Sequence, residues 1–128
     1  MKIGMKYRVT HQVTEGVTAA SLDSAMMPVL ATPWLIAFLE GAAAKCVEAE
    51  LPGTQITLGT LVNIRHLAAT PVGMEVTCEV ELTEIDRRRL VFAVRAWDDA
   101  GPICEGTHER FIADRDSFLK KTRAKLDR

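Results

Sequence analysis

The feature that most limits the fold of this chain is one long apolar helix, predicted from Thr32-Pro33 to about Glu50. Threonine is a common N-cap residue and proline is tolerated at the first helical position, so this pair favours a helix start. Leu51-Pro52-Gly53 ends the pattern. Most faces of the helix are apolar, with Lys45 and Glu48 on its wet side, so we expect it to be deeply buried.

The rest of the chain shows the period of two that is typical of half-buried strands. Before the helix this alternation covers Tyr7 to Val13, whereas residues 15–31 lack it and predict a loop or a short helical turn. Four strands are predicted after the helix, at residues 56–67, 74–85, 88–97 and 102–113. Residues 116–126 mix apolar and charged side chains and predict a surface helix.

This order of elements, a strand, a long helix and four strands in an antiparallel meander, indicates an α+β fold. A sheet that covers a single apolar helix can wrap around it. That arrangement is the hot-dog fold, and residues 1–128 are predicted to form one such domain with a C-terminal surface helix. Because so small a sheet leaves an unpaired edge, we expect at least a homodimer, in which pairing between copies hides that edge.

Composition excludes several classes of protein. Sixteen basic and seventeen acidic residues give a net charge of -1, which provides no basic surface for nucleic acid or for an anionic membrane. We find no apolar run of eighteen residues and no apolar signal segment at the N-terminus. Three cysteines without a CxxC pair argue against a disulfide framework or a zinc site and favour a reducing compartment, the cytoplasm.

Glu40 is the most informative single position, because it places a carboxylate on an apolar stripe of the predicted helix. Its helical neighbours are all apolar: Ile36, Ala37, Ala43, Ala44 and Val47. A carboxylate in such surroundings destabilises the fold unless it is paired or protonated. Glu40 is therefore either a residue that reaches water at the edge of a cavity or a functional carboxylate.

His66 continues a strand face that also holds Thr60, Val62 and Ile64. A histidine in such a position is more often a core residue than a catalytic one. The same face should look toward the helix that carries Glu40, and this favours a functional interpretation of His66.

Thr32 and Gly59 give weaker signals. N-capping alone explains Thr32, although a hydroxyl there also lies beside free backbone amides that stabilise an anion. Thr32 and Glu40 are about 12 Å apart along a helix axis, so their spacing does not make them a hydrogen-bonded pair. Gly59 lies inside a predicted strand, where glycine marks either a bulge or a close approach of a ligand to the backbone.

The remaining polar residues have simpler interpretations. His108, in the stretch Gly106-Thr107-His108-Glu109-Arg110, is predicted to make cross-strand contacts at the surface. Arg87, Arg88 and Arg89 crowd one turn, where they are either solvated or available to a phosphate-bearing ligand. The three cysteines are interpreted as core residues. We find no phosphate loop, no HExxH and no GxSxG motif, which excludes an α/β-hydrolase.

Two stretches together give the chain a specific resemblance. His66-Leu67-Ala68-Ala69-Thr70-Pro71-Val72-Gly73 and Gly106 to Arg110, with Ala31-Thr32-Pro33, Leu39 to Ala43 and Leu58-Gly59-Thr60, resemble the fluoroacetyl-CoA thioesterase family. The resemblance covers about residues 5 to 115. It implies a hot-dog dimer that hydrolyses a short acyl-CoA thioester, with acyl-CoA as substrate and with neither a metal nor a cofactor.

The family uses a threonine, a glutamate and a histidine, which correspond to Thr32, Glu40 and His66, and its strand glycine corresponds to Gly59. The resemblance implies that Glu40 attacks the thioester carbonyl or activates water, and that His66 acts as general acid and base. Thr32 then positions Glu40 or the substrate. The three residues meet either within one chain or across a dimer.

The segment before the helix departs from the family, whose fluoroacetyl-specific member carries phenylalanines in a longer lid. Residues 21–28 contain no phenylalanine here. We expect this segment to cover the acyl end of the pocket through Leu22, Ala25, Met26 and Met27, and to accept several short- or medium-chain acyl groups. Met26, Met27, Gly59 and Arg88 are the predicted substrate-binding residues. Two alternatives on the same fold are a non-catalytic protein that binds acyl-CoA or a small aromatic ligand, and a dehydratase or hydratase.

Overall fold

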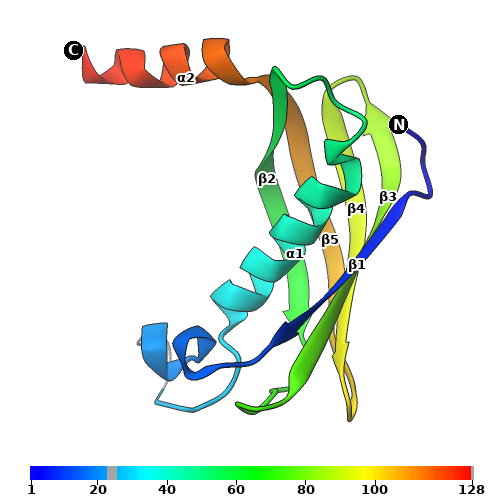
Figure 1. Ribbon diagram of the computed structural model, residues 1–128, viewed down its shortest axis with the longest axis vertical. Helices are drawn as coiled ribbons and strands as arrows, with labels where there is room; N and C mark the ends of the chain where they lie inside the picture. The colour runs from blue at the N-terminus through cyan, green and yellow to red at the C-terminus, as the bar shows by residue number, and fades with distance from the viewer. Residues whose placement is uncertain (23–25, 128) are drawn as a thin grey trace.

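The computed structural model describes residues 1–22 and 26–127, which form one antiparallel sheet curved around one helix (Figure 1). The main elements are β1 Lys6–Gln12, α1 Thr32–Glu48, β2 Gln55–His66, β3 Glu75–Asp86, β4 Arg89–Asp98, β5 Gly101–Asp114 and α2 Arg115–Arg123. Short 3-10 turns are η1 Glu15–Val17, η2 Ala20–Leu22 and η3 Ala124–Leu126. The predicted hot-dog fold is confirmed, and the predicted strand ends are correct to within one or two residues.

The five strands lie in the order β1-β3-β4-β5-β2, and every neighbouring pair is antiparallel. β3, β4 and β5 form a meander, with Arg87 in the left-handed region at the tight β3–β4 turn (φ 58°). The predicted meander of four strands is wrong for β2, because β2 pairs with β5 and not with β3. β1 and β2 are the two edges of the sheet. α1 crosses the concave face of the sheet (Figure 1).

The core lies between that concave face and one side of α1. On β3 and β4 the inward residues are the ones that the alternation predicted: Val76, Cys78, Val80, Leu82, Leu90, Phe92 and Val94, all buried. On α1 the buried residues are Leu35, Leu39, Ala42, Ala43, Cys46 and Val47. All three cysteines are free and buried.

The prediction that α1 is deeply buried on most faces is wrong for the single chain. Ala37 and Gly41 are exposed, and the Trp34 side chain is 36% exposed, because one sheet covers only one side of a helix. The apolar residues on the other faces of α1 are therefore left exposed in the single chain, and another surface is needed to bury them. None of the helices in the described part of the chain has the length and apolar character needed to cross a membrane.

A β-bulge in β2 decides which side chains of this strand face the helix. Gly59 pairs with Arg110 and Leu61 pairs with Glu109, so the register with β5 shifts between Gly59 and Leu61. A strand without a bulge would send Gly59 and His66, an odd and an even position, to opposite faces. The extra residue places both of them on the side of α1.

Candidate active site

Thr32 and His66 meet at the N-terminal end of α1. The Thr32 hydroxyl lies 2.7 Å from His66 Nδ1, so the first residue of the helix is hydrogen-bonded to the last residue of β2. His66 Nε2 is buried and has no hydrogen-bond partner within residues 1–22 and 26–127. An imidazole held by one nitrogen, with its other nitrogen unsatisfied, is ready to bind a group from outside the chain.

The expectation that Thr32 is an N-cap is wrong. Ala31 occupies the N-cap position of α1, Thr32 is the first helical residue, and the Ala31 side chain makes no capping hydrogen bond. The Thr32 hydroxyl is committed to the imidazole of His66 and makes no bond to a helix amide. Its role is therefore tied to His66 and not to helix stability.

The loop after β2 holds this corner in place through Thr70, the first residue of its Thr70-Pro71 pair. The buried Thr70 hydroxyl donates to the Asp98 carboxylate at 2.8 Å, and the Thr70 carbonyl accepts from the Leu30 amide at 2.9 Å. Leu30 comes just before α1, and Thr70 comes just after His66. The loop therefore ties the start of the helix to the end of the strand, which fixes Thr32 against His66.

Burial lowers the pKa of His66, and the nearby polar backbone of Ala68 opposes that effect. A lowered pKa keeps the imidazole neutral near neutral pH, which suits a general base. The neutral form contributes stability that is complete above the ordinary pKa of 6.5 and is lost as the pH falls toward the lower folded value.

Glu40 lies further along α1 and faces a different part of β2. Its Oε2 is 3.6 Å from Arg110 Nη1, and its side chain is 42% exposed. A Cβ added to Gly59 would lie 2.5 Å from that same Oε2. Glycine at position 59 therefore leaves open the space into which the carboxylate points, and any larger residue would displace the carboxylate.

Arg110 and His108 are the residues that sequence reasoning missed. The expectation of a surface role for His108 is wrong, because its side chain is 1% exposed and that of Arg110 only 6%. Leu61 O lies 2.8 Å from His108 Nδ1, and Arg110 Nη1 lies 3.2 Å from His108 Nε2. Arg110 also donates to the side chain and carbonyl of Thr57, at 2.9 and 2.8 Å. The guanidinium is thus fixed beside Glu40.

This network fixes the tautomer of His108. Arginine can only donate, so His108 Nε2 accepts and Nδ1–H donates to the Leu61 carbonyl, as in a neutral imidazole. Burial lowers the pKa of His108, and the Arg110 charge lowers it further, against the opposing carboxylates of Glu40 and Glu109. The neutral histidine therefore serves as the hydrogen-bond acceptor that orients Arg110.

The two corners are separate within one chain. No hydrogen bond or ion pair joins Glu40 to Thr32 or His66 in the part of the chain that the structure describes. Thr32 and Glu40 are about 12 Å apart along α1, and Gly59 and His66 are roughly 20 Å apart along β2. The structure thus joins Thr32 to His66, joins Glu40 to Gly59, and leaves the two pairs apart.

The other predicted substrate-binding residues lie outside both corners. Met26 and Met27 precede α1 and are 85% and 56% exposed, whereas Ala25 lies outside the described residues. Arg88 lies in the β3–β4 turn, where its guanidinium pairs with Asp114 at 3.3 Å. Their part in binding stays a prediction. Across residues 1–22 and 26–127, no three His, Cys, Asp or Glu side chains gather as metal ligands would.

Comparisons with known proteins agree on one family. The model of the fluoroacetyl-CoA-specific thioesterase family matches residues 13–116. The fluoroacetyl-CoA thioesterase of Streptantibioticus cattleyicolor is 34% identical over 116 residues, which cover 90% of this chain and 84% of the relative. A solved threonine-to-serine variant of the fluoroacetyl-CoA thioesterase, in complex with acetyl-CoA, matches with a TM-score of 0.93 and 30% identity over 98% of both chains.

A more distant protein shows the same fold. The hot-dog-like protein from Thermanaerovibrio acidaminovorans matches with a TM-score of 0.90 and 22% identity, over 98% of this chain and 93% of that one. The curved sheet and its single central helix are thus common to proteins with little sequence in common.

Proposed function

Because this chain belongs to the fluoroacetyl-CoA-specific thioesterase family, we propose that it hydrolyses a short- or medium-chain acyl-CoA to the free acid and CoA at a site shared by two copies. The chain is an acyl-CoA thioesterase. Thr32 and His66 of one copy and Glu40 of the other form each site. The observation that carries this proposal is the unsatisfied, buried Nε2 of His66, at a distance from Glu40 in its own chain.

The edge strand β2 supplies the dimer contact. Its middle, residues 59–63, is exposed, including Leu61 and Val62, and within residues 1–22 and 26–127 β5 is the one strand that pairs with it. The other edge, β1, carries the charged Lys6 and Arg8, which discourage such pairing. Two copies that pair through β2 about a two-fold axis perpendicular to the sheet place these strands antiparallel.

That antiparallel pairing brings the two corners together. The Gln55 end of one β2 lies beside the His66 end of its partner, so the Gly59 of one copy approaches the His66 of the other. Glu40 of the first copy approaches the same His66, because Glu40 faces Gly59 in its own chain. The carboxylate then lies near the unsatisfied imidazole nitrogen, which it cannot reach within its own chain.

The chemistry assigns one task to each group. Glu40 supplies the oxygen nucleophile, either by attacking the thioester carbonyl itself or by taking a proton from a water that attacks. If Glu40 attacks, the thiolate leaves as an acyl anhydride forms on Glu40, and neutral His66 takes the proton of the water that then hydrolyses the anhydride and gives it to the thiolate. If water attacks, the proton that it loses passes through Glu40 and His66 to the CoA thiolate as the C–S bond breaks. Thr32 holds the imidazole through Nδ1, and the free amides at the start of α1 stabilise the oxyanion.

We infer that this reaction needs no cofactor, because a carboxylate, an imidazole and water are sufficient for thioester hydrolysis. Acyl-CoA enters as substrate. The three free, buried thiols are compatible with a reducing compartment such as the cytoplasm, which stays a prediction.

A panel of acyl-CoA esters of two to ten carbons, with a thiol-trapping dye, tests the reaction. We expect CoA release from several short or medium members, and light scattering near twice 14.1 kDa. Binding without CoA release would instead support a non-catalytic acyl-CoA protein. Loss of the conjugated absorbance of an enoyl-CoA would support a hydratase.

A further inference from the structure

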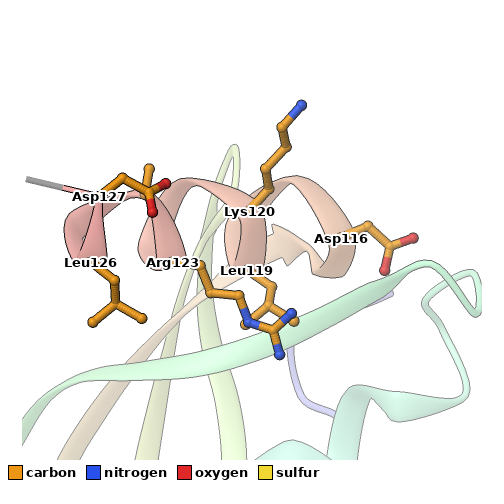
Figure 2. Close-up of a pocket in the computed structure, with 7 residues that line it drawn as sticks. Asp116, Leu119, Lys120, Arg123, Leu126 and Asp127 are labelled. Atoms are coloured by element: carbon orange, nitrogen blue, oxygen red, sulfur yellow. The ribbon is translucent and has the colours of Figure 1, made fainter.

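His108 lies at the centre of a buried polar cluster that is separate from the Thr32–His66 corner. Its side chain is 1% exposed, and its neighbours come from β2, β4 and β5. The hollow beside α2 is different, because it is open, measures about 500 Å³ and has lining residues that all lie between 116 and 127 (Figure 2). A hollow lined by one short segment does not hold groups of different elements against each other, whereas the cluster around His108 does.

The Nδ1 side of the His108 ring holds the bulge of β2. Nδ1–H donates to the Leu61 carbonyl, with 2.8 Å between the nitrogen and the oxygen. Leu61 is the residue at which the pairing of β2 with β5 resumes after the register shift that begins at Gly59. The imidazole therefore fastens the distortion that turns Gly59 toward Glu40.

The Nε2 side of the ring restrains Arg110. Arg110 Nη1 donates to Nε2 at 3.2 Å, while Nε and Nη2 donate to the hydroxyl and the carbonyl of Thr57. Held in this way, Arg110 Nη1 stays 3.6 Å from Glu40 Oε2, beyond the roughly 2.7–3.2 Å of an ordinary hydrogen bond. The two charges attract each other at this distance without a direct hydrogen bond between them.

That separation matters for the chemistry of the Glu40 carboxylate. An arginine that hydrogen-bonds a carboxylate stabilises its charged form and makes it a weaker base and nucleophile. Without the Nε2 acceptor, a buried N–H of Arg110 would be unpaired beside Glu40, and an unpaired buried donor is costly until it finds an acceptor. His108 thus keeps Arg110 from closing onto the carboxylate.

The ring also borders the space in front of the carboxylate. A Cβ added to Gly59 would lie 3.2 Å from His108 Cε1 and 3.5 Å from Arg110 Nη1. Phe92 packs on the imidazole with ring centroids 6.3 Å apart, which restrains the plane of the ring. Because burial lowers the pKa of His108, the imidazole is neutral near neutral pH and keeps one nitrogen as an acceptor.

We propose that His108 is a positioning residue for thioester hydrolysis, which fastens the bulge of β2 through Nδ1 and keeps Arg110 off the Glu40 carboxylate through Nε2. Its effect on the reaction passes through Arg110 and Glu40. The inference rests on the proposed function, and it adds to the site a residue of β5 beside the three catalytic groups.

Two replacements that each keep half of the ring's hydrogen bonding test this role. In His108→Gln the amide oxygen takes the place of Nε2 and accepts from Arg110. His108→Asn is shorter and keeps only a donor near Nδ1, for the Leu61 carbonyl. We expect kcat to fall at least about tenfold in the asparagine variant, as for a displaced catalytic group, and less than about threefold in the glutamine variant. KM for the acyl-CoA should change little in both.

Thr107→Ala is the matched control, because Thr107 precedes His108 on β5 and is exposed. It should leave kcat unchanged, and thermal melts followed by circular dichroism check that every variant folds. If His108 only filled space, kcat would follow stability, and both ring replacements would lose it together. Equal kcat values in the glutamine and asparagine variants would therefore overturn the positioning role.

A measurement on the unaltered chain covers the case in which a variant does not fold. Nitrogen-15 NMR distinguishes a protonated from an unprotonated ring nitrogen, and we expect His108 to carry its proton on Nδ1 at neutral pH. A proton on Nε2 would leave Arg110 without its acceptor and would overturn the proposal.

The outcomes also separate this inference from the proposed function. Hydrolysis of acyl-CoA with equal kcat in the two ring variants overturns the role of His108 and leaves the thioesterase activity standing. Absence of CoA release from the unaltered protein overturns the proposed activity and the positioning role together, whichever nitrogen carries the proton.

Discussion

The N-terminal end and the middle of α1 offer the substrate different chemical groups. At its N-terminal end, Thr32 and His66 are joined by a direct hydrogen bond of 2.7 Å, and the Glu40 carboxylate of the same chain is out of reach. Midway along the helix, Glu40 faces Gly59 and a fixed Arg110, and the site lacks a proton donor for a leaving thiolate. Each corner is ordered and chemically incomplete, which is what a site divided between two copies requires.

The corners also differ in how they are built. The Thr32–His66 corner depends on the ends of two elements, the start of α1 and the end of β2, and on the loop that ties them together. The Glu40 corner depends on the middle of the sheet, where the buried His108 and Arg110 come from β5. The first should tolerate changes in β5, and the second should tolerate changes in the loop after β2.

Removing the reactive group from either corner should have the largest effect. His66→Ala and Glu40→Gln should each lower kcat/KM for acyl-CoA hydrolysis by at least about a hundredfold, the scale of acid–base catalysis. Glu40 is partly exposed and 3.6 Å from Arg110, so Glu40→Gln should change thermal stability little. Circular dichroism and thermal melts check that both variants fold.

Near wild-type turnover in both folded variants would show that neither corner takes part in the reaction. Loss of activity in only one of them would show that the corners are not parts of one site.

Filling the space beside Glu40 should have the next largest effect. Gly59→Ala places a methyl group where Glu40 Oε2 now lies within 2.5 Å, so the carboxylate must move. We expect kcat/KM to fall by about ten- to hundredfold, as for a displacement of about 1 Å at a catalytic group. Gly53→Ala, which meets nothing within 4 Å, is the matched control. Equal rates for the two alanine variants would mean that Glu40 does not need its present position.

Loosening the imidazole should have a smaller effect. Thr32→Val keeps the shape of the side chain but removes the hydroxyl at His66 Nδ1, and should lower kcat about tenfold, whereas Thr32→Ser should stay near wild type. Because burial lowers the pKa of His66, the wild-type rate should fall only as the pH drops below 6.5.

The valine variant should also move that acid limb. It moves to higher pH if the hydroxyl donates to the imidazole and to lower pH if it accepts. An acid limb that stays in place would contradict the role of Thr32.

The choice between acyl groups should show the smallest effect. Methionines adapt to irregular space, and one small apolar difference is worth only about 1–3 kcal/mol in a pocket. With Met26 and Met27 near the Thr32–His66 end, we expect little preference for fluoroacetyl-CoA over acetyl-CoA. The ratio of the two kcat/KM values measures it. A preference beyond about a thousandfold exceeds what one such contact provides and would contradict the assignment of this segment.

The sequence was sufficient to predict the fold because its periodicities are local. The alternation on β3 and β4 identified inward residues such as Val76 and Phe92, which are fully buried. The Thr-Pro start and Pro-Gly stop of α1 were correct to within two residues. These signals depend on neighbours in the chain, where periodicity is informative.

Parts of the site depend on contacts between distant residues, and there the sequence was less informative. An unbroken alternation cannot show the bulge that turns both Gly59 and His66 toward α1. Nor can it show that His108 is buried, since a polar ring is placed inside only by partners such as Arg110 and the Leu61 carbonyl. A signal was present in the His-Glu-Arg spacing, which puts His108 and Arg110 on one face of β5. In the structure Arg110 is opposite Gly59, and His108 is opposite Val62.

Mixing two inactive variants tests the shared site most directly. Glu40→Gln protein and His66→Ala protein are refolded together so that half of the dimers contain one chain of each kind. If the site is shared, each mixed dimer has one intact site, made by the Glu40 of one chain and the His66 of the other, and one doubly altered site. Random pairing of the chains should then restore about a quarter of wild-type activity. If every site lies within one chain, no mixed dimer has an intact site, and activity that stays at the level of the separate variants would contradict the account.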